Sequence, residues 1–148
     1  MERLTAKRGT GQSGRVVGSA AYDMASGVIA HARGFVRDFL SEAQSLRGLD
    51  VPARTLDTAQ LVVSELATNV CKYAPGPCLL DLEVDGSRLD ITMWDSGSAL
   101  PTASQADPTR AGQHGLEIVR AVSRSLEVRR APVGKRVHVQ ISLFEEAA

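Results

Sequence analysis

Three short groups of residues in this 148-residue chain have types and spacing that suit the handling of a charged substrate. Glu65 and Asn69 stand four residues apart in a stretch of helical periodicity, so a carboxylate and an amide are neighbours on one helix surface. Asp95 closes a strand-like run, and Gly97 follows it. A pair of glycines at 112–115 opens a further helix. These residue types could supply a general base, an oxygen ligand for Mg²⁺, an acceptor for an amino group and an anion-binding turn.

The first group lies on a predicted helix at 55–73. At about 100° per residue its apolar side chains share one stripe, which predicts the face packed on a sheet: Leu56, Ala59, Val63, Leu66 and Val70. Glu65 and Asn69 point roughly 100° away from the centre of this stripe, and Lys72 lies on the same flank. We expect these three side chains at the rim of the core, beside a cleft. An isolated Glu-x-x-x-Asn is more often a solvated helix flank, so this group needs support from the others.

The second group ends a predicted strand at 88–95. Its core-facing positions are apolar until the last, which is an acid: Leu89, Ile91, Met93 and Asp95. An acid at the edge of a core needs a hydrogen-bond donor, and a ligand could provide it. Gly97 would let the backbone approach that ligand closely. The alternative is an Asx-type turn, in which Asp95 accepts from its own backbone.

The third group is Gly112-Gln-His-Gly115-Leu116, at the end of a Pro-, Ser- and Gly-rich stretch. We expect residues 96–114 to form a long loop or lid and 116–122 a short helix. The free N–H groups at the start of that helix would make an anion site, and Arg110 and Lys72 could add charge-assisted contacts. Glycines at a helix start are common, so this group is also weak alone.

The order of elements predicts an α+β fold. We expect a two-layer sandwich in which a mixed, mostly antiparallel sheet carries its helices on one face. The predicted helices span 24–46, 55–73 and 116–122, and the predicted strands span 15–22, 79–84, 88–95, 126–130 and 135–143. Residues 15–144 are predicted to form one domain after a disordered tail at 1–14. That tail contains a literal G-x-G-x-x-G, but it follows no strand, so we discard it as a nucleotide motif.

The composition excludes several classes of protein. Lys plus Arg and Asp plus Glu both total 17, so no net charge attracts nucleic acid or an anionic membrane. No apolar run approaches the roughly 20 residues that span a bilayer. The chain begins without an apolar signal segment, so we expect a cytoplasmic protein with Cys71 and Cys78 reduced.

In combination, the three groups resemble the ATP site of the GHKL superfamily, which includes histidine kinases and gyrase. The run at 61–69 is similar to the small anti-sigma-factor serine/threonine kinases of actinobacteria. This resemblance implies a Bergerat-type ATP-binding fold with ATP and Mg²⁺ as ligands. It implies that Asn69 holds Mg²⁺, that Glu65 is the general base and that Asp95 reads adenine. The remaining implied nucleotide-binding residues are Lys72, Gly97, Arg110, Gly112, Gly115 and Leu116.

The resemblance also implies partners: an anti-sigma antagonist protein, a sigma factor or both, with neither nucleic acid nor membrane bound directly, and a homodimer as in many relatives. The run at 72–76 looks more like sensor histidine kinases, but those usually have Asn in place of Glu65 and need a phospho-acceptor helical hairpin. Three departures from the small kinases are Tyr73 in place of His, Ala99 in place of Gly, and the absence of a Thr from 135–139.

Two functions therefore stay open. The first is a kinase that transfers phosphate from ATP to a Ser or Thr hydroxyl of the antagonist. The second is a partner-switching binding module that sequesters a regulator, with or without nucleotide. A plain α+β scaffold, whose glycines and acids only serve turns, is the third and most remote interpretation.

Overall fold

The computed structural model describes residues 15–23, 27–97 and 111–144, which form five strands and three helices. The strands are β1 (Val16–Tyr22), β2 (Cys78–Asp85), β3 (Arg88–Asp95), β4 (Ser125–Arg130) and β5 (Lys135–Ser142). The helices are α1 (Val28–Arg47), α2 (Ala53–Tyr73) and α3 (Ala111–Val122). Their order along the chain is the predicted one.

The strands form one sheet in the order β1-β2-β3-β5-β4, and every pair of neighbours is antiparallel. The α+β class is thus confirmed, although the sheet of the described residues is antiparallel throughout rather than mixed. β1 is an edge strand, as its short sequence predicted, and β4 forms the opposite edge. β3 lies at the centre between β2 and β5, so the end of β3 has a strand on each side.

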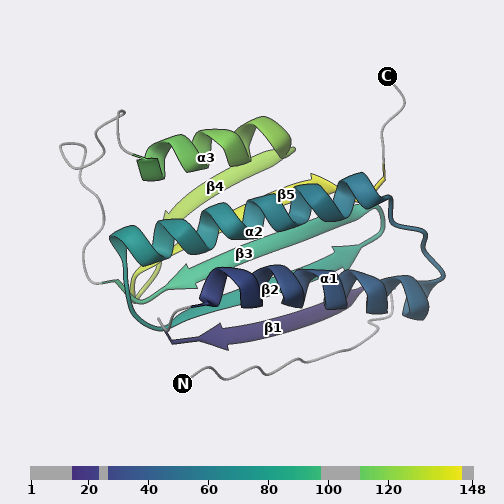
Figure 1. Cartoon of the computed structure of the whole chain (residues 1–148), viewed down its shortest axis with the longest axis horizontal. Coiled ribbons are helices and arrows are strands. Elements are labelled where there is room, and N and C mark those ends of the chain that lie inside the picture. Colours follow the sequence, from purple (N-terminus) through teal and green to yellow (C-terminus); the bar gives the residue numbers. More distant parts are fainter. Residues whose placement is uncertain (1–14, 24–26, 98–110, 145–148) are drawn as a thin grey trace.

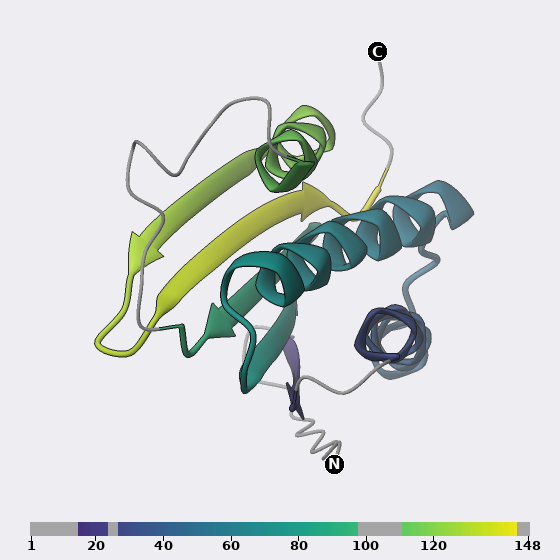
Figure 2. The ribbon, with the colours of Figure 1, turned by 60° about the vertical axis from the view of Figure 1, so that its left-hand side comes forward.

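All three helices cover the same face of the sheet, which makes the predicted two-layer sandwich (Figures 1 and 2). Strands β1, β2 and β5 alternate between buried residues under the helices and less buried residues on the open face. In α2 the predicted stripe is buried at Ala59, Val63, Leu66 and Val70, while Leu56 is partly buried against the core. Period-two strands and a 3.6-period helix therefore bury their apolar sides against each other.

Most element boundaries agree with prediction to within two residues, which is the ordinary uncertainty at element ends. α1 begins at Val28 after Gly27, whose φ of 91° is in the left-handed region. The predicted tail at 1–14 and residues 98–110 of the predicted lid lie outside the described residues. Within the described residues, no helix is long and apolar enough to cross a membrane.

The prediction for the third helix was wrong at its start. α3 begins at Ala111 rather than at residue 116, so Gly112 and Gly115 belong to the helix and not to a lid that precedes it. Glycine disfavours a helix interior by only about 0.5–1 kcal/mol relative to alanine. Packing of α3 on its neighbours outweighs that penalty, since Val119 is fully buried and Leu116 packs against the core.

One end of the molecule collects the features that the sequence singled out. The carboxyl ends of α2 and β3, the start of α3 and the turn between β4 and β5 all lie there, on the left in Figure 1. Antiparallel pairing explains part of this arrangement, because β5 starts beside the place where β3 ends. The candidate site is built at this end.

Candidate functional site

Glu65 lies against the first turns of α3. A Cβ atom built on Gly115 would be 2.6 Å from Glu65 Oε2, so only a glycine lets the carboxylate approach this backbone. The residue is half-buried, and within the described residues its carboxylate has no hydrogen-bond or ion-pair partner. The structure thereby brings together Glu65 of the first group and Gly115 of the third. A carboxylate in this position is available to accept a proton.

Asn69 lies one turn further along α2 and is only 7% exposed. Its side-chain amide has no hydrogen-bond partner among the described residues. Because no group of the described residues occupies the amide oxygen, a cation or ligand can take it as a ligand atom. In the part of the chain that the structure describes, no cluster of three His, Cys, Asp or Glu side chains could hold a metal. The available oxygen of Asn69 fits a hard cation that completes its shell from phosphate and water.

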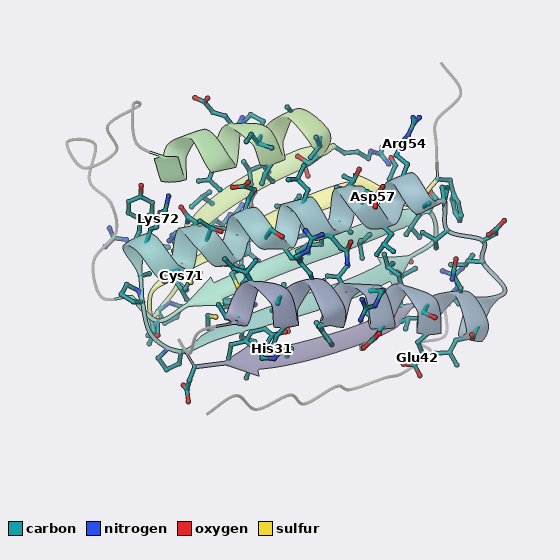
Figure 3. The ribbon with its side chains drawn as sticks, in the orientation of Figure 1. His31, Glu42, Arg54, Asp57, Cys71 and Lys72 are labelled. Atoms are coloured by element: carbon teal, nitrogen blue, oxygen red, sulfur yellow. The ribbon has the colours of Figure 1, made fainter. Side chains whose placement is uncertain are left out.

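Lys72 is exposed in the last turn of α2, on the same flank as Glu65 and Asn69. Figure 3 shows it at the end of α2 nearest the start of α3, whereas Arg54 and Asp57 lie at the opposite end of the helix. An ammonium at this position can reach an anion bound between the two helices. The other predicted cation, Arg110, lies outside the described residues.

The anion site at the start of α3 is also displaced from its predicted position. Because the helix begins at Ala111, its free N–H groups belong to residues 111–114, one turn before Gly115. Gly112 lies in this first turn, while Gly115 provides the close contact with Glu65. Leu116 anchors the turn by packing against the core. The site can still attract a phosphate, but through the backbone that precedes Gly115.

Asp95 already has donor partners within the protein. Its Oδ1 accepts hydrogen bonds from the backbone N–H groups of Gly97 and Lys135, both at 3.1 Å. Its Oδ2 accepts from the ammonium of Lys135 at 2.7 Å. The bond from Gly97 is the Asx-type turn that the sequence left open as an alternative. The carboxylate is therefore held in place before any ligand arrives.

Gly97 is a site of close approach, and its described neighbour is Ala74. A Cβ atom on Gly97 would lie 2.6 Å from the Cβ of Ala74, the residue that caps the end of α2. This contact fixes the end of β3 against the end of α2. It brings the second group of residues up to the first.

Sequence reasoning missed Lys135, although a signal was present. Lys135 shares its face of β5 with three buried residues, Val137, Val139 and Ile141. A lysine at a core-facing position needs an acid partner, because burial of an unpaired ammonium is costly. The side chains of Lys135 and Asp95 are 6% and 4% exposed, so the ion pair is almost completely buried.

Cys78 lines the other side of Asp95, its cross-strand neighbour in β2. Burial, together with the nearby charges of Cys71 and Asp95, raises the pKa of the Cys78 thiol to about 11. The thiol is consequently protonated at neutral pH and behaves as a small apolar side chain. Cys78 therefore contributes packing beside Asp95 and no reactive thiolate.

A hollow lies on the open face of the sheet, away from the predicted residues. Its volume is about 480 Å³, and it is lined mostly by polar residues of four strands. Asp81 accepts hydrogen bonds there from Ser19 and from the indole of Trp94. Asp90 accepts from Arg88, and its carboxylate is 2.9 Å from His138 Nε2. These groups satisfy each other, in contrast to the unpartnered Glu65 and Asn69.

Comparison with known proteins identifies the family and the fold of the chain. Residues 28–141 match the family model described as the histidine kinase-like ATPase domain. Among solved structures, the chain is similar to the histidine kinase domain from the Erythrobacter litoralis EL346 blue-light activated histidine kinase, with a TM-score of 0.50 and 20% sequence identity. That match covers 76% of this chain and 61% of the other, and it shows a shared fold. No curated protein matches the chain.

Proposed function

The chain belongs to the histidine kinase-like ATPase family, and we propose that it is an ATP-binding anti-sigma factor with protein serine/threonine kinase activity. Domains of this family generally bind ATP with Mg²⁺, which supports an ATP-binding regulatory function. The finer assignment rests on Glu65 and Asn69, whose run at 61–69 resembles the small anti-sigma kinases. The proposed substrate is a Ser or Thr hydroxyl of an antagonist protein, and a sigma factor is the proposed second partner.

One observation carries the proposal: the Glu65 carboxylate has no partner among the described residues and lies against Gly115, at the helix start proposed to hold the phosphates. As general base, Glu65 takes the proton of the substrate hydroxyl while the hydroxyl oxygen attacks the γ-phosphorus. The bond from that phosphorus to the β–γ bridging oxygen breaks, and ADP leaves. Such a transfer depends mainly on positioning and on stabilisation of charge.

The other groups bind and orient the triphosphate. The free N–H groups of residues 111–114 face the anion, and Lys72 adds a positive charge from the last turn of α2. Asn69 offers its amide oxygen to Mg²⁺, which when bound neutralises phosphate charge. Arg110 completes the proposed set of cations.

Substitution of Glu65 by Gln tests this assignment, because it keeps the shape of the side chain and removes the base. We expect Glu65→Gln to bind Mg·ATP like the wild type and to lose phosphate transfer by about 10²–10⁴-fold. The assay measures labelled phosphate transferred from ATP to candidate antagonist proteins. Glu83→Gln, on the open face of β2, is the matched control and should transfer normally. Wild-type transfer by Glu65→Gln would exclude Glu65 as the base.

A binding module without kinase activity is the second candidate function. The observation that favours it is the Asp95–Lys135 ion pair, which already occupies part of the hydrogen-bonding capacity of the acid proposed to read adenine. In that case the domain sequesters its regulator, and no phosphorylated partner forms even when ATP raises the melting temperature. Dimerisation would be compatible with either function and is open to sedimentation analysis.

A further inference from the structure

The buried pair of Asp95 and Lys135 lies where the base of a bound nucleotide is expected. Lys135 Nζ is 2.7 Å from Asp95 Oδ2, with both side chains nearly inaccessible to solvent. Taking two charges out of water is expensive, and an apolar pair at this position would avoid that expense. A buried ion pair beside a candidate ligand site therefore calls for an explanation beyond stability.

The backbone holds this pair in place. β3 and β5 pair with Trp94 opposite Arg136, which brings Asp95 next to Lys135 at the end of the ladder. The preceding Gly134 has a φ of 70°, and a Cβ there would be 2.0 Å from the carbonyl oxygen of Asp95. The turn between β4 and β5 thus presses directly on the end of β3. The position of Lys135 is a consequence of strand register and does not depend on a flexible loop.

The hydrogen-bonding capacity of the pair is only partly used. Asp95 Oδ1 already accepts two backbone N–H groups, whereas from the described residues Oδ2 accepts only the ammonium. A carboxylate oxygen can accept about two hydrogen bonds, so Oδ2 can take one more. The ammonium has three N–H donors, and among the described residues Asp95 takes one of them. A free acceptor and a free donor consequently lie side by side.

This arrangement complements one edge of a purine. Adenine presents an amino donor at C6 beside the ring acceptor N1, so a single acceptor and a single donor satisfy it. Guanine presents two donors, N1–H and the 2-amino group, beside its O6 acceptor. Because Oδ1 is already filled, the carboxylate can accept only one of these donors, and the other would stay unpaired at a cost. The observed pair therefore favours adenine over guanine.

We infer that Lys135 is a specificity-determining residue that donates a hydrogen bond to N1 of adenine while Asp95 Oδ2 accepts the 6-amino group. This inference rests on the proposed binding of ATP and adds a second base-reading residue to Asp95. It also accounts for the buried charge, because the ion pair holds the donor beside the acceptor before the nucleotide binds.

The experiment compares binding of ATP and of 1-deaza-ATP, in which the N1 acceptor is replaced by C–H, by calorimetry with Mg²⁺. We expect the wild type to bind 1-deaza-ATP about tenfold more weakly or worse, since a hydrogen bond to a charged group is lost. Lys135→Met should weaken ATP binding by a similar factor and bind the two nucleotides equally. Lys135→Arg, which keeps charged donors, should restore part of the discrimination. Arg130→Met removes a positive charge from the exposed residue opposite Lys135 and is the matched control.

The outcomes separate this inference from the proposed function. If the wild type binds both nucleotides equally, or if Lys135→Met keeps the full discrimination, the inference is overturned while ATP binding stands. Tighter ATP binding by Lys135→Met would also overturn it, because Lys135 would then compete with adenine. Absence of ATP binding by the wild type would instead remove the proposed function itself. The wild-type comparison needs no variant, so a poorly folded Lys135→Met cannot obscure the result.

Discussion

Substitution of Gly134 by Ala probes the contact between the β4–β5 turn and Asp95 at the end of β3. Alanine at a φ of 70° costs about 1–2 kcal/mol, because its Cβ meets the backbone in the left-handed region. The new Cβ would also lie 2.0 Å from the carbonyl oxygen and 2.6 Å from the carbonyl carbon of Asp95. These are backbone atoms of β3 and cannot turn aside, so overpacking adds about 1–3 kcal/mol. We expect Gly134→Ala to lower the free energy of unfolding by about 2–5 kcal/mol in total.

Gly86 provides the matched control for this prediction. Its φ of 63° imposes the same strain on alanine, but no atom lies within 4 Å of the added Cβ. Gly86→Ala should therefore lose only the conformational part, about 1–2 kcal/mol. Urea denaturation measures both variants, and the midpoint should fall further for Gly134→Ala at an unchanged slope. Equal losses would refute the close packing of the β4–β5 turn on Asp95.

Two other perturbations test the contact of Glu65 with Gly115 and the burial of Cys78. Gly115→Ala should leave the free energy of unfolding unchanged or raise it by up to about 1 kcal/mol, because alanine favours a helix over glycine. It should nevertheless reduce phosphate transfer about hundredfold, because Glu65 Oε2 must move away by roughly 1 Å from a Cβ that would lie at 2.6 Å. Gly34→Ala in α1 is the control, because its Cβ would lie 3.6 Å from Arg37. It should change stability by a similar amount and keep phosphate transfer. Equal transfer by the two variants would disprove the role of the contact between Glu65 and Gly115. The second perturbation is a rise in pH. The pKa of the Cys78 thiol is about 11 in the folded protein against 9.0 for a free thiol, so between these values the folded thiol stays protonated while the unfolded thiol ionises. The stability present below pH 9 is therefore lost as the pH rises to 11. Urea unfolding should show that the free energy of unfolding of the wild type is lower at pH 10.5 than at pH 8 by roughly 2 kcal/mol. Cys78→Ala should lack this loss. An equal loss in Cys78→Ala would show that Cys78 does not cause the pH dependence.

Much of this arrangement is readable in the sequence because it depends on local periodicity. The stripe on α2 and the alternation in β3 place Glu65, Asn69 and Asp95 at the ends of elements that face one core. The contact between Glu65 and Gly115 links two segments 50 residues apart, and only their motifs hinted at it. Local periodicity was enough to predict the helices and strands, and the order of the motifs was enough to predict which residues meet at the site.

Two features depend on tertiary packing, and the prediction failed there. The α3 helix starts earlier than predicted because its burial against α2 and the sheet outweighs the weak helix propensity of Gly112 and Gly115. The sequence predicts a ligand or a local Asx-type turn as the partner of Asp95, whereas Lys135 also donates to it from the neighbouring strand β5. The core-facing position of Lys135 in β5 indicates that it needs an acid partner, but strand register determines which acid it meets.

The most direct measurement of the central claim is a titration of the ¹⁵N-labelled chain with Mg·ATP, followed by amide NMR shifts. The account predicts that the side-chain amide of Asn69 and the backbone amides of Gly97 and Gly115 shift together with one dissociation constant. Residues of the open sheet face, such as Asp81 and His138, should not respond. Shifts confined to that open face, or none at millimolar nucleotide, would contradict the placement of the nucleotide between α2, the end of β3 and α3.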